Sequence, residues 1–515
     1  MKFYLVFFVV LVLAALDAAP VLAQVKAIQP TDPPREAEPD PNAVKVVELR
    51  LTPAGEPRPA LKYELLPSPI ERKPGNRATH YYRAMLLHQQ VQANLPKEEW
   101  QKLNELEQTW TECPLNKLPQ EEIRKHVAKY SAAIREIKTA AYREEGQFNL
   151  RLQDLRGMDT INFLLPDMQE MRGLARLLRY QTRLEIAEGK YSSAIETMRQ
   201  GFQLGRDSAE PPLLITSLIG IAVATINAAE VEELIAAPGS PNLYWALATL
   251  PKPLIDMRPG MRIEMEMPAR MFDFLNDAET IEMSAGEWHA RMMKTMLEMQ
   301  QLGAMTGGGQ AEKPDWKSQL ALAAMLIRVY GECKKALIES GESAEKVEKM
   351  PVGKVVAIQA SRAYRQTYHE MFKWALLPYS DLPREEPDPL ESLRKKGQGL
   401  GALSAADPLM IASLLLPAIK QARLAEVRLQ KNLAALQTIE ALRLYAATHE
   451  GKLPTALADI TQVPVPINPT TGKPFAYELR GETATLDVPS VAANNGHRDA
   501  RRYVIRLATQ ASGKK

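Results

Sequence analysis

The chain has 515 residues and a nearly balanced charge, with a formal net charge of +2 at pH 7. A chain of this length is too long for one compact core and predicts about two to four domains at roughly 150 residues each. Apolar residues make up 45% of the chain and charged residues 24%, which is ordinary for a globular protein. The charge balance gives no reason to expect nucleic acid or an acidic membrane surface as the main partner.

The first 23 residues predict an export signal peptide. A lysine precedes the apolar run 3–16, and small residues at 21–23 are typical of a cleavage site. The run is shorter than the roughly 20 residues that span a bilayer, although an uncleaved N-terminal anchor is the alternative. We therefore expect an exported protein of the periplasm or cell envelope. In that compartment Cys113 and Cys333 can pair, or can stay two separate thiols.

A helical body is predicted after a short linker. Residues 24–45 are rich in proline and charge and predict a disordered linker. The runs 46–51 and 61–66 are strand-like and flank a turn-rich segment, which predicts a small β-hairpin. The rest of the body, through residue 378, is rich in Ala, Leu, Glu, Arg and Met, all strong helix formers.

Two segments of this body predict particular helix arrangements. Residues 178–206, with a turn at Gly189, Tyr191 and Ala194, resemble one tetratricopeptide-type helical hairpin. We favour a plain αα-hairpin, with the tetratricopeptide-type unit as the alternative, because no second copy follows at a period of about 34 residues. Residues 213–229 are nearly uncharged and predict a helix buried on all sides, with a membrane span as the alternative.

A methionine-rich segment and a linker follow. Residues 257–305 carry eleven of the 21 methionines. Thioethers suit Cu(I), but such sites also use His or Cys, and only His289 is nearby. We expect these methionines to fill a core, with a methionine-lined partner surface as a further reading. No metal or cofactor is predicted. Residues 379–407 are rich in Pro, Gly and charge and predict a linker.

The C-terminal region 408–515 predicts a small α+β module. Asp407 and Pro408 are typical of a helix start, and apolar residues then recur at helical spacing through Tyr445. The strand-like runs 475–479 and 483–486 flank Arg480-Gly481, which predicts a hairpin, and 503–507 predicts a third strand. The module is therefore expected to be one long helix followed by a short antiparallel sheet.

Two phrases in this module are similar to the C-terminal half of type II secretion pseudopilins, over about residues 408–486. The first contains Leu444, Tyr445, Gly451, Leu453 and Pro454, and the second contains Asn468, Pro469, Gly472, Pro474, Phe475 and Tyr477. Asn468 stands where that family usually carries Asp. The resemblance implies a helix that leads into a small sheet, and a role as accessory to a pilus-like or secretion apparatus. The six residues of the second phrase form a candidate structural motif.

The whole chain also resembles large exported helical proteins of bacteria whose function is not known. The phrases that carry this resemblance are LKYELLP, LLPDMQEMRGLARLL and PNLYWALATLP. The resemblance implies an exported helical protein and no particular activity.

Taken together, the patterns predict a mainly α fold with a multi-helix body of αα-hairpins, TPR-like in part, and the C-terminal α+β module. The sequence has no G-x-S-x-G elbow, no dinucleotide fingerprint and no HExxH motif. We therefore expect a non-enzymatic scaffold or partner-binding protein of the envelope, with a protein or peptide partner. The alternatives are the apparatus accessory and an exported hydrolase with a dispersed acidic site. No catalytic residue is predicted.

Overall fold

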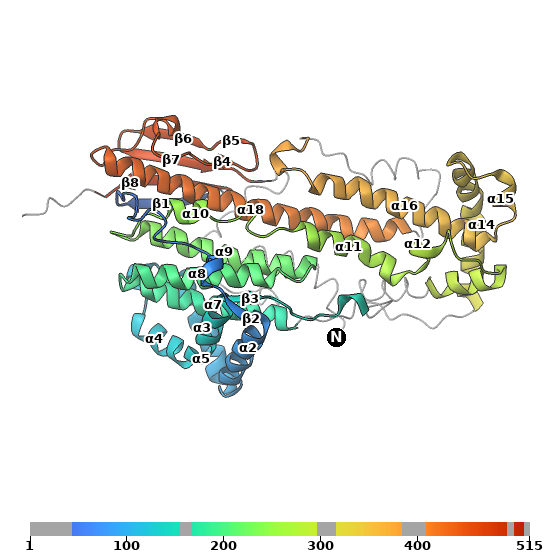
Figure 1. The fold of residues 1–515 in the computed structure, drawn as a ribbon, viewed down its shortest axis with the longest axis horizontal. Coiled ribbons are helices and arrows are strands. Elements are labelled where there is room, and N and C mark those ends of the chain that lie inside the picture. The colour runs from blue at the N-terminus through green and yellow to red at the C-terminus, as the bar shows by residue number, and fades with distance from the viewer. Residues whose placement is uncertain (1–43, 155–165, 296–315, 384–407, 492–498, 509–515) are drawn as a thin grey trace, which may run out of the picture. The chain divides into compact units, whose positions relative to one another are not determined.

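A computed structural model describes residues 44–154, 166–295, 316–383, 408–491 and 499–508. Helices dominate this part of the chain, and the largest sheet joins strands from both of its ends (Figure 1). The predicted mainly α class with a small C-terminal sheet is thus confirmed. The chain forms two compact units. The sheet unit contains the described residues of Leu22–Asn149, Leu165–Met257 and Leu424–Lys515, and the helical unit contains those of Leu150–Leu164 and Arg258–Arg423.

The four-stranded sheet has the order β1-β8-β7-β6. The strands are β1 (Lys45–Leu51), β6 (Ala476–Arg480), β7 (Thr483–Val488) and β8 (Arg501–Leu507). The hairpin of β6 and β7 is antiparallel as predicted, and Gly481 takes a φ of 60° in its turn. Side chains of β7 alternate between half-buried and buried, which gives this sheet one core face.

The hairpin predicted near the N-terminus is wrong. Residues 61–66 form no strand, and β1 instead pairs in parallel with β8, Lys45 opposite Arg501 and Leu51 opposite Leu507. Parallel strands need no tight turn between them, so the turn-rich segment after β1 is available for another role. This pairing also moves the unit boundary. The N-terminal part of the predicted body, 44–149, belongs to the same compact unit as the C-terminal sheet.

Helix α18 (Pro408–Thr448) begins and runs close to where the sequence predicts, and the sheet lies along its last turns (Figure 1). From residue 424 onward most of its apolar side chains are buried, as are several polar ones: Lys431, Gln437, Thr438, Glu440 and Arg443. A helix that buries polar groups on several faces must satisfy each of them with partners inside the protein.

Three consecutive helices form the centre of the sheet unit: α7 (Pro166–Ala187), α8 (Tyr191–Ser208) and α9 (Leu214–Ala236). The turn between α7 and α8 uses Gly189 at a φ of 70°, so the predicted αα-hairpin is confirmed. Helices α8 and α9 cross closely, because a Cβ on Gly220 would lie 2.5 Å from the Gly205 carbonyl oxygen.

Helix α9 contains the apolar segment whose environment the sequence left open. It is the one helix among the described residues that is long and apolar enough to cross a membrane, and 72% of its most apolar window is buried inside the protein. Such burial is typical of a core helix, as predicted.

The remaining elements of the sheet unit are shorter. They are β2 (Lys73–Asn76), α2 (Arg77–Ala93), α3 (Lys97–Glu112), α4 (Gln120–Lys129), α5 (Ser131–Ala141), β3 (Arg143–Glu145), α10 (Tyr244–Ala248), β4 (Ile467–Asn468) and β5 (Lys473–Pro474). Strands β2 and β3 pair in parallel, and β4 and β5 form a short antiparallel ladder.

The helical unit contains α11 (Arg258–Met271), α12 (Phe274–Asp277), α14 (Trp316–Glu339), α15 (Ala344–Glu348) and α16 (Val352–Ala375). Its core includes Met271, Trp288 and Met292, and Met261 and Met265 are also buried. These methionines fill a core as expected, whereas Met296, Met299 and Met305 lie outside the described residues. Cys333 belongs to this unit and Cys113 to the sheet unit, and both are thiols.

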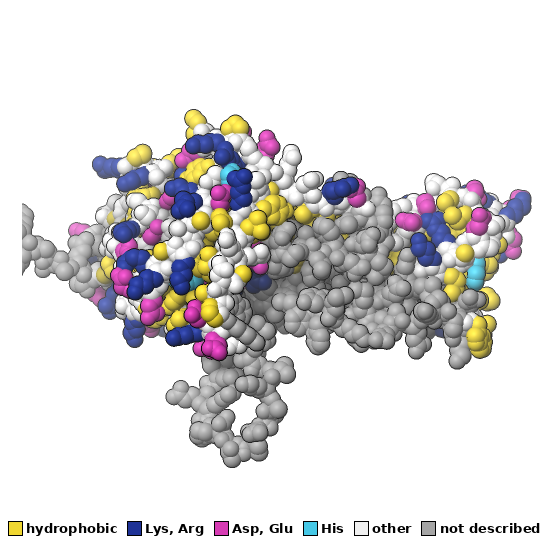
Figure 2. Space-filling model, turned by 90° about the horizontal axis from the view of Figure 1, so that it is seen from below, with side chains coloured by type: hydrophobic (Ala, Val, Ile, Leu, Met, Phe, Trp, Pro, Cys, Tyr) yellow, Lys and Arg dark blue, Asp and Glu magenta, His cyan; other side chains and the backbone are white. Residues whose placement is uncertain are grey.

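The surface drawn in Figure 2 mixes charges of both signs. Lys and Arg side chains are interspersed with Asp and Glu over the described residues of this face. Such mixing is typical of a solvated surface and weakens long-range attraction to any single-sign partner. A binding site must therefore be sought in local geometry.

Candidate functional site

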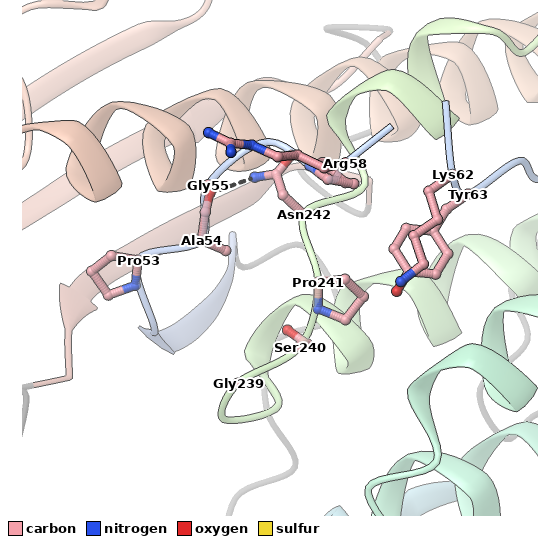
Figure 3. Close-up of a pocket in the computed structure, with 11 residues that line it drawn as sticks. Pro53, Ala54, Gly55, Arg58, Lys62, Tyr63, Gly239, Ser240, Pro241 and Asn242 are labelled. Carbon is pink, nitrogen blue, oxygen red and sulfur yellow. Dashed lines mark hydrogen bonds between the residues drawn. The ribbon is translucent and has the colours of Figure 1, made fainter. Parts of the chain in front are cut away.

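A pocket of about 290 Å³ lies in the sheet unit between two loops (Figure 3). One loop follows β1, and the other connects α9 to α10. The described residues that line the pocket are Pro53, Ala54, Gly55, Pro57, Arg58, Lys62, Tyr63, Gly239, Ser240, Pro241 and Asn242. Five of these eleven are Pro or Gly, so much of the wall is main chain and short side chain. The volume is near the lower end of the range for small-ligand sites.

The first loop is extended because its prolines cannot continue a helix or a central strand. Its position is fixed at both ends of the segment 54–56. The Ala54 N–H donates to the Arg443 carbonyl oxygen at 3.2 Å, and Trp245 Nε1 donates to the Glu56 carboxylate. This is the turn-rich segment that the sequence placed in a hairpin.

The second loop follows α9, and in it Gly239 takes a φ of 73° that suits glycine. Asn242 follows and is 2% exposed. Its Oδ1 accepts the Tyr244 N–H at 2.9 Å, which makes an Asx turn just before the short helix α10. Tyr244 is buried and donates its hydroxyl to the Pro464 carbonyl oxygen. Tyr244 therefore anchors the start of α10 to the segment before β4.

A fully buried ion pair on α18 holds the two loops together. Arg443 Nη1 donates to both Glu440 oxygens at 3.1 and 3.0 Å, and neither side chain is exposed to solvent. The rest of the guanidinium reaches both walls. Nε donates to the Thr52 carbonyl oxygen at 3.0 Å, and Nη2 donates to the Ser240 carbonyl oxygen at 2.8 Å.

Glu440, the acidic partner of Arg443, also contacts the second loop directly. Its carboxylate accepts the Leu243 N–H at 2.9 Å and Asn242 Nδ2 at 2.8 Å. Burial raises the pKa of the Glu440 carboxyl, and the nearby Arg443 guanidinium opposes that rise. Because every polar group of the pair has partners, the pair fixes the positions of both loops.

The mouth of the pocket is cationic. Arg58 and Lys62 are exposed, and the Lys62 ammonium lies 5.2 Å from the centroid of the Tyr63 ring. In Figure 3 the Lys62 and Tyr63 side chains reach toward Pro241. None of the eleven lining residues carries a carboxylate, an imidazole or a thiol. Such a lining suits binding rather than acid–base or nucleophilic catalysis, which needs a base beside the reacting group.

The six residues of the predicted structural motif lie at and beyond the β4–β5 turn, apart from the pocket lining. Asn468 is 2% exposed, its Oδ1 accepts the Thr470 N–H, and its carbonyl oxygen accepts the Gly472 N–H at 2.9 Å. Gly472 takes a φ of 66°, and Pro469 lies in the same turn. Pro474 belongs to β5.

The last two residues of the motif connect this turn to the sheet. The Phe475 side chain is 4% exposed, and the Tyr477 hydroxyl donates to the Pro454 carbonyl oxygen at 2.8 Å. That bond joins the two phrases of the pseudopilin-like segment in space. The motif residues make turn and packing contacts.

Another buried cluster of the sheet unit contains ionisable groups. Asp207 is 2% exposed and accepts hydrogen bonds from Arg77 at 2.7 Å, Tyr81 at 2.6 Å and Gln203 at 2.6 Å. Burial raises the pKa of its carboxyl, which Arg77 opposes. These bonds join α2 to α8 and use the carboxylate fully, so the cluster is a packing element.

The patterns of the sequence do not predict the pocket. Its one local signal is the density of Pro and Gly with two cations in the segment 53–63, which lacks any apolar periodicity. The opposite wall comes from residues 239–242, and the ion pair comes from α18. Nothing in local sequence places these three segments together.

Comparisons with known proteins add no identity to this geometry. No family model matches the chain, and no curated protein or solved structure matches it.

Proposed function

We propose that this protein is a non-enzymatic binding protein of the cell envelope that receives an extended segment of a partner protein in the pocket of the sheet unit. The observation that carries the proposal is the Glu440–Arg443 pair, which fixes both pocket walls through bonds to Thr52, Ser240 and Asn242. A site that is already ordered loses less conformational entropy on binding than a flexible one.

The composition of the walls supports a peptide as ligand. Main-chain groups of the loop at 53–57 and of Gly239 lie at the pocket surface, together with the rings of Pro53 and Pro241. Extended peptides bind well to surfaces that combine apolar rings with polar main chain. The lining offers no nucleophile with an adjacent base, so a binding role fits better than hydrolysis by a dispersed site.

The envelope location rests on sequence alone. The apolar run 3–16 and the small residues at 21–23 support export, and the proline-rich residues 24–45 support a linker between that signal and the folded part. Fusing residues 1–45 to a reporter enzyme that works only outside the cytoplasm tests this location. Reporter activity supports export, and activity confined to the cytoplasm contradicts it.

The binding role is tested by filling the pocket. A Cβ on Gly55 would meet nothing within 4 Å, so Gly55→Trp places a large ring at the pocket without a clash at its attachment point. Gly286→Trp is the matched control, because Gly286 is also exposed with open space around it but lies in the helical unit.

Each full-length variant would be cross-linked in envelope preparations and its partners quantified. We expect the same partners for the wild type and Gly286→Trp, and their loss for Gly55→Trp. Partners that persist unchanged with Gly55→Trp would contradict a role for the pocket.

A second candidate function is favoured by one observation. The segment that resembles pseudopilins folds as a helix, α18, beside the strands β6, β7 and β8 (Figure 1). This arrangement supports an accessory role in a pilus-like or secretion apparatus. A photo-cross-linking residue at the exposed Glu478 of β6 would then capture apparatus components. Capture only from position 55 would favour the pocket instead.

A further inference from the structure

The chemistry of the pocket selects among peptide ligands. Its two charged lining residues, Arg58 and Lys62, are both cations, and no described carboxylate lies within ion-pair distance of either. Most other cations of the sheet unit that are close to the core have an acidic partner, as Arg77 has Asp207 at 2.7 Å. The charged side chains that line the pocket are therefore both positive, although the chain as a whole is nearly neutral.

Ser240 adds a donor inside the pocket. Its Oγ accepts Arg443 Nη2 at 3.0 Å, and Arg443 can only donate, so the hydroxyl must use a lone pair there. The hydroxyl hydrogen has no acceptor among the described residues. Ser240 is 2% exposed and lines the pocket, so this buried hydroxyl is left to donate to whatever enters. A buried donor without a partner favours an acceptor-rich ligand.

We infer that the pocket binds the carboxylate of an acidic residue in an extended peptide, with Lys62 pairing the charge and Ser240 donating from within; the Arg58 guanidinium points away from Lys62, toward Gly55 (Figure 3). This inference rests on the proposed function and names its ligand class. Guanidinium and ammonium groups form their strongest hydrogen bonds to such anions. The Pro and Gly lining and the Tyr63 ring leave apolar room for the aliphatic stem and main chain of that residue.

The test measures peptide binding to the full chain by fluorescence anisotropy. The probes are the labelled peptide Ala-Ala-Glu-Ala-Ala and its neutral counterpart Ala-Ala-Gln-Ala-Ala, both with blocked ends. We expect the Glu peptide to bind about tenfold more tightly, because a hydrogen bond to a charged group is worth about one order of magnitude in affinity. High salt should reduce that difference, since the two cations are exposed.

Variants localise the interaction. Lys62→Gln should weaken binding of the Glu peptide by about three- to tenfold, and Arg58→Gln, whose guanidinium points away from Lys62 in Figure 3, should weaken it less. Lys125→Gln removes the same charge from an exposed position of α4 and should change affinity by less than about twofold. All three positions are exposed, and unchanged circular dichroism would confirm that each variant folds. Equal binding of the two peptides, or equal losses for Lys62→Gln and Lys125→Gln, would overturn the inference.

Competition with inorganic phosphate tests whether the pocket prefers a free oxyanion to the carboxylate of the peptide. Displacement of the Glu peptide only at phosphate concentrations well above the peptide's Kd supports the inference, whereas tighter binding of phosphate than of the peptide overturns it.

The two proposals fail separately. If the Glu peptide binds as expected but Gly55→Trp keeps its cross-linked partners, the proposed function fails alone. If those partners are lost while both peptides bind equally, the ligand class fails alone.

Discussion

Replacement of Arg443 by methionine tests whether the buried ion pair organises the pocket. Methionine keeps much of the aliphatic volume but removes every donor, so Glu440 is left as a buried carboxylate without a counter-charge. The carbonyl oxygens of Thr52 and Ser240 lose their partners as well. The matched variant is Arg443→Met with Glu440→Gln, which removes both charges together.

The expected magnitude follows from these contacts. Breaking a buried pair by removing one partner costs about 3–5 kcal/mol, and each orphaned buried carbonyl adds about 1 kcal/mol or more. We therefore expect Arg443→Met to lower the free energy of unfolding by about 5 kcal/mol. The double variant keeps an oxygen that can accept the Leu243 N–H, so it should lose only about half as much.

The pH dependence gives the sharper readout. Burial already raises the pKa of Glu440, and loss of Arg443 raises it further. A carboxyl whose folded pKa lies above its unfolded pKa gains stability as pH falls, by about 1.4 kcal/mol per unit between the two values. The deficit of Arg443→Met should therefore shrink from about pH 7 to about pH 5, whereas that of the double variant should not.

Urea unfolding, monitored by hydrogen exchange of residues 52–63, measures the loss of unfolding free energy in the sheet unit and its dependence on pH. A loss below about 1 kcal/mol for Arg443→Met, or a deficit that does not change with pH, would refute the reasoning.

Three further predictions follow from other contacts. Gly220→Val should lower the free energy of unfolding by about 2 kcal/mol or more, seen as a lower midpoint of thermal unfolding, because its Cβ would strike the α8 backbone, whereas Gly331→Ala, with open space around it, should be neutral or slightly stabilising. Burial lowers the pKa of His126 to about 4, so stability should fall by about 3 kcal/mol as pH drops from about 6.5 to 4. That component should vanish from urea unfolding of His126→Phe, and an unchanged pH profile would contradict the assignment. Lys431→Met should cost about 3 kcal/mol in urea unfolding, because it removes the nearest counter-charge of the Asp499 carboxylate and the donor to two carbonyl oxygens, and a loss near zero would show that water replaces the lysine.

Local patterns predicted the elements whose partners are close in sequence. The α7–α8 hairpin follows from Gly189, and the β6–β7 hairpin follows from Arg480-Gly481, because a short turn leaves its own residues as a signal. The burial of α9 followed from its lack of charge. In both hairpins, residues close in sequence determine the contact.

The features that the sequence did not predict depend on distant partners. Strand β1 has no turn that marks its pairing with β8, so its nearest strand-like neighbour was chosen instead. The pocket was not predicted for the same reason, because Arg443 bonds to Thr52 and Ser240, which lie 391 and 203 positions away in the sequence. From the sequence alone, the buried charged residues of α18 cannot be distinguished from polar residues on an exposed helix face.

The parallel pairing of β1 with β8 has a consequence for how the chain is made. Lys45 finds its partner only when Arg501 has been synthesised, and at roughly 5–20 residues per second this takes on the order of 20–90 s. During that interval β1 and the loop after it cannot take their final places, and neither can the pocket. A chain that leaves the cytoplasm as it is made would therefore travel in an unfolded state that export machinery can accept. The last strand to emerge would then close the sheet and order the binding loop together.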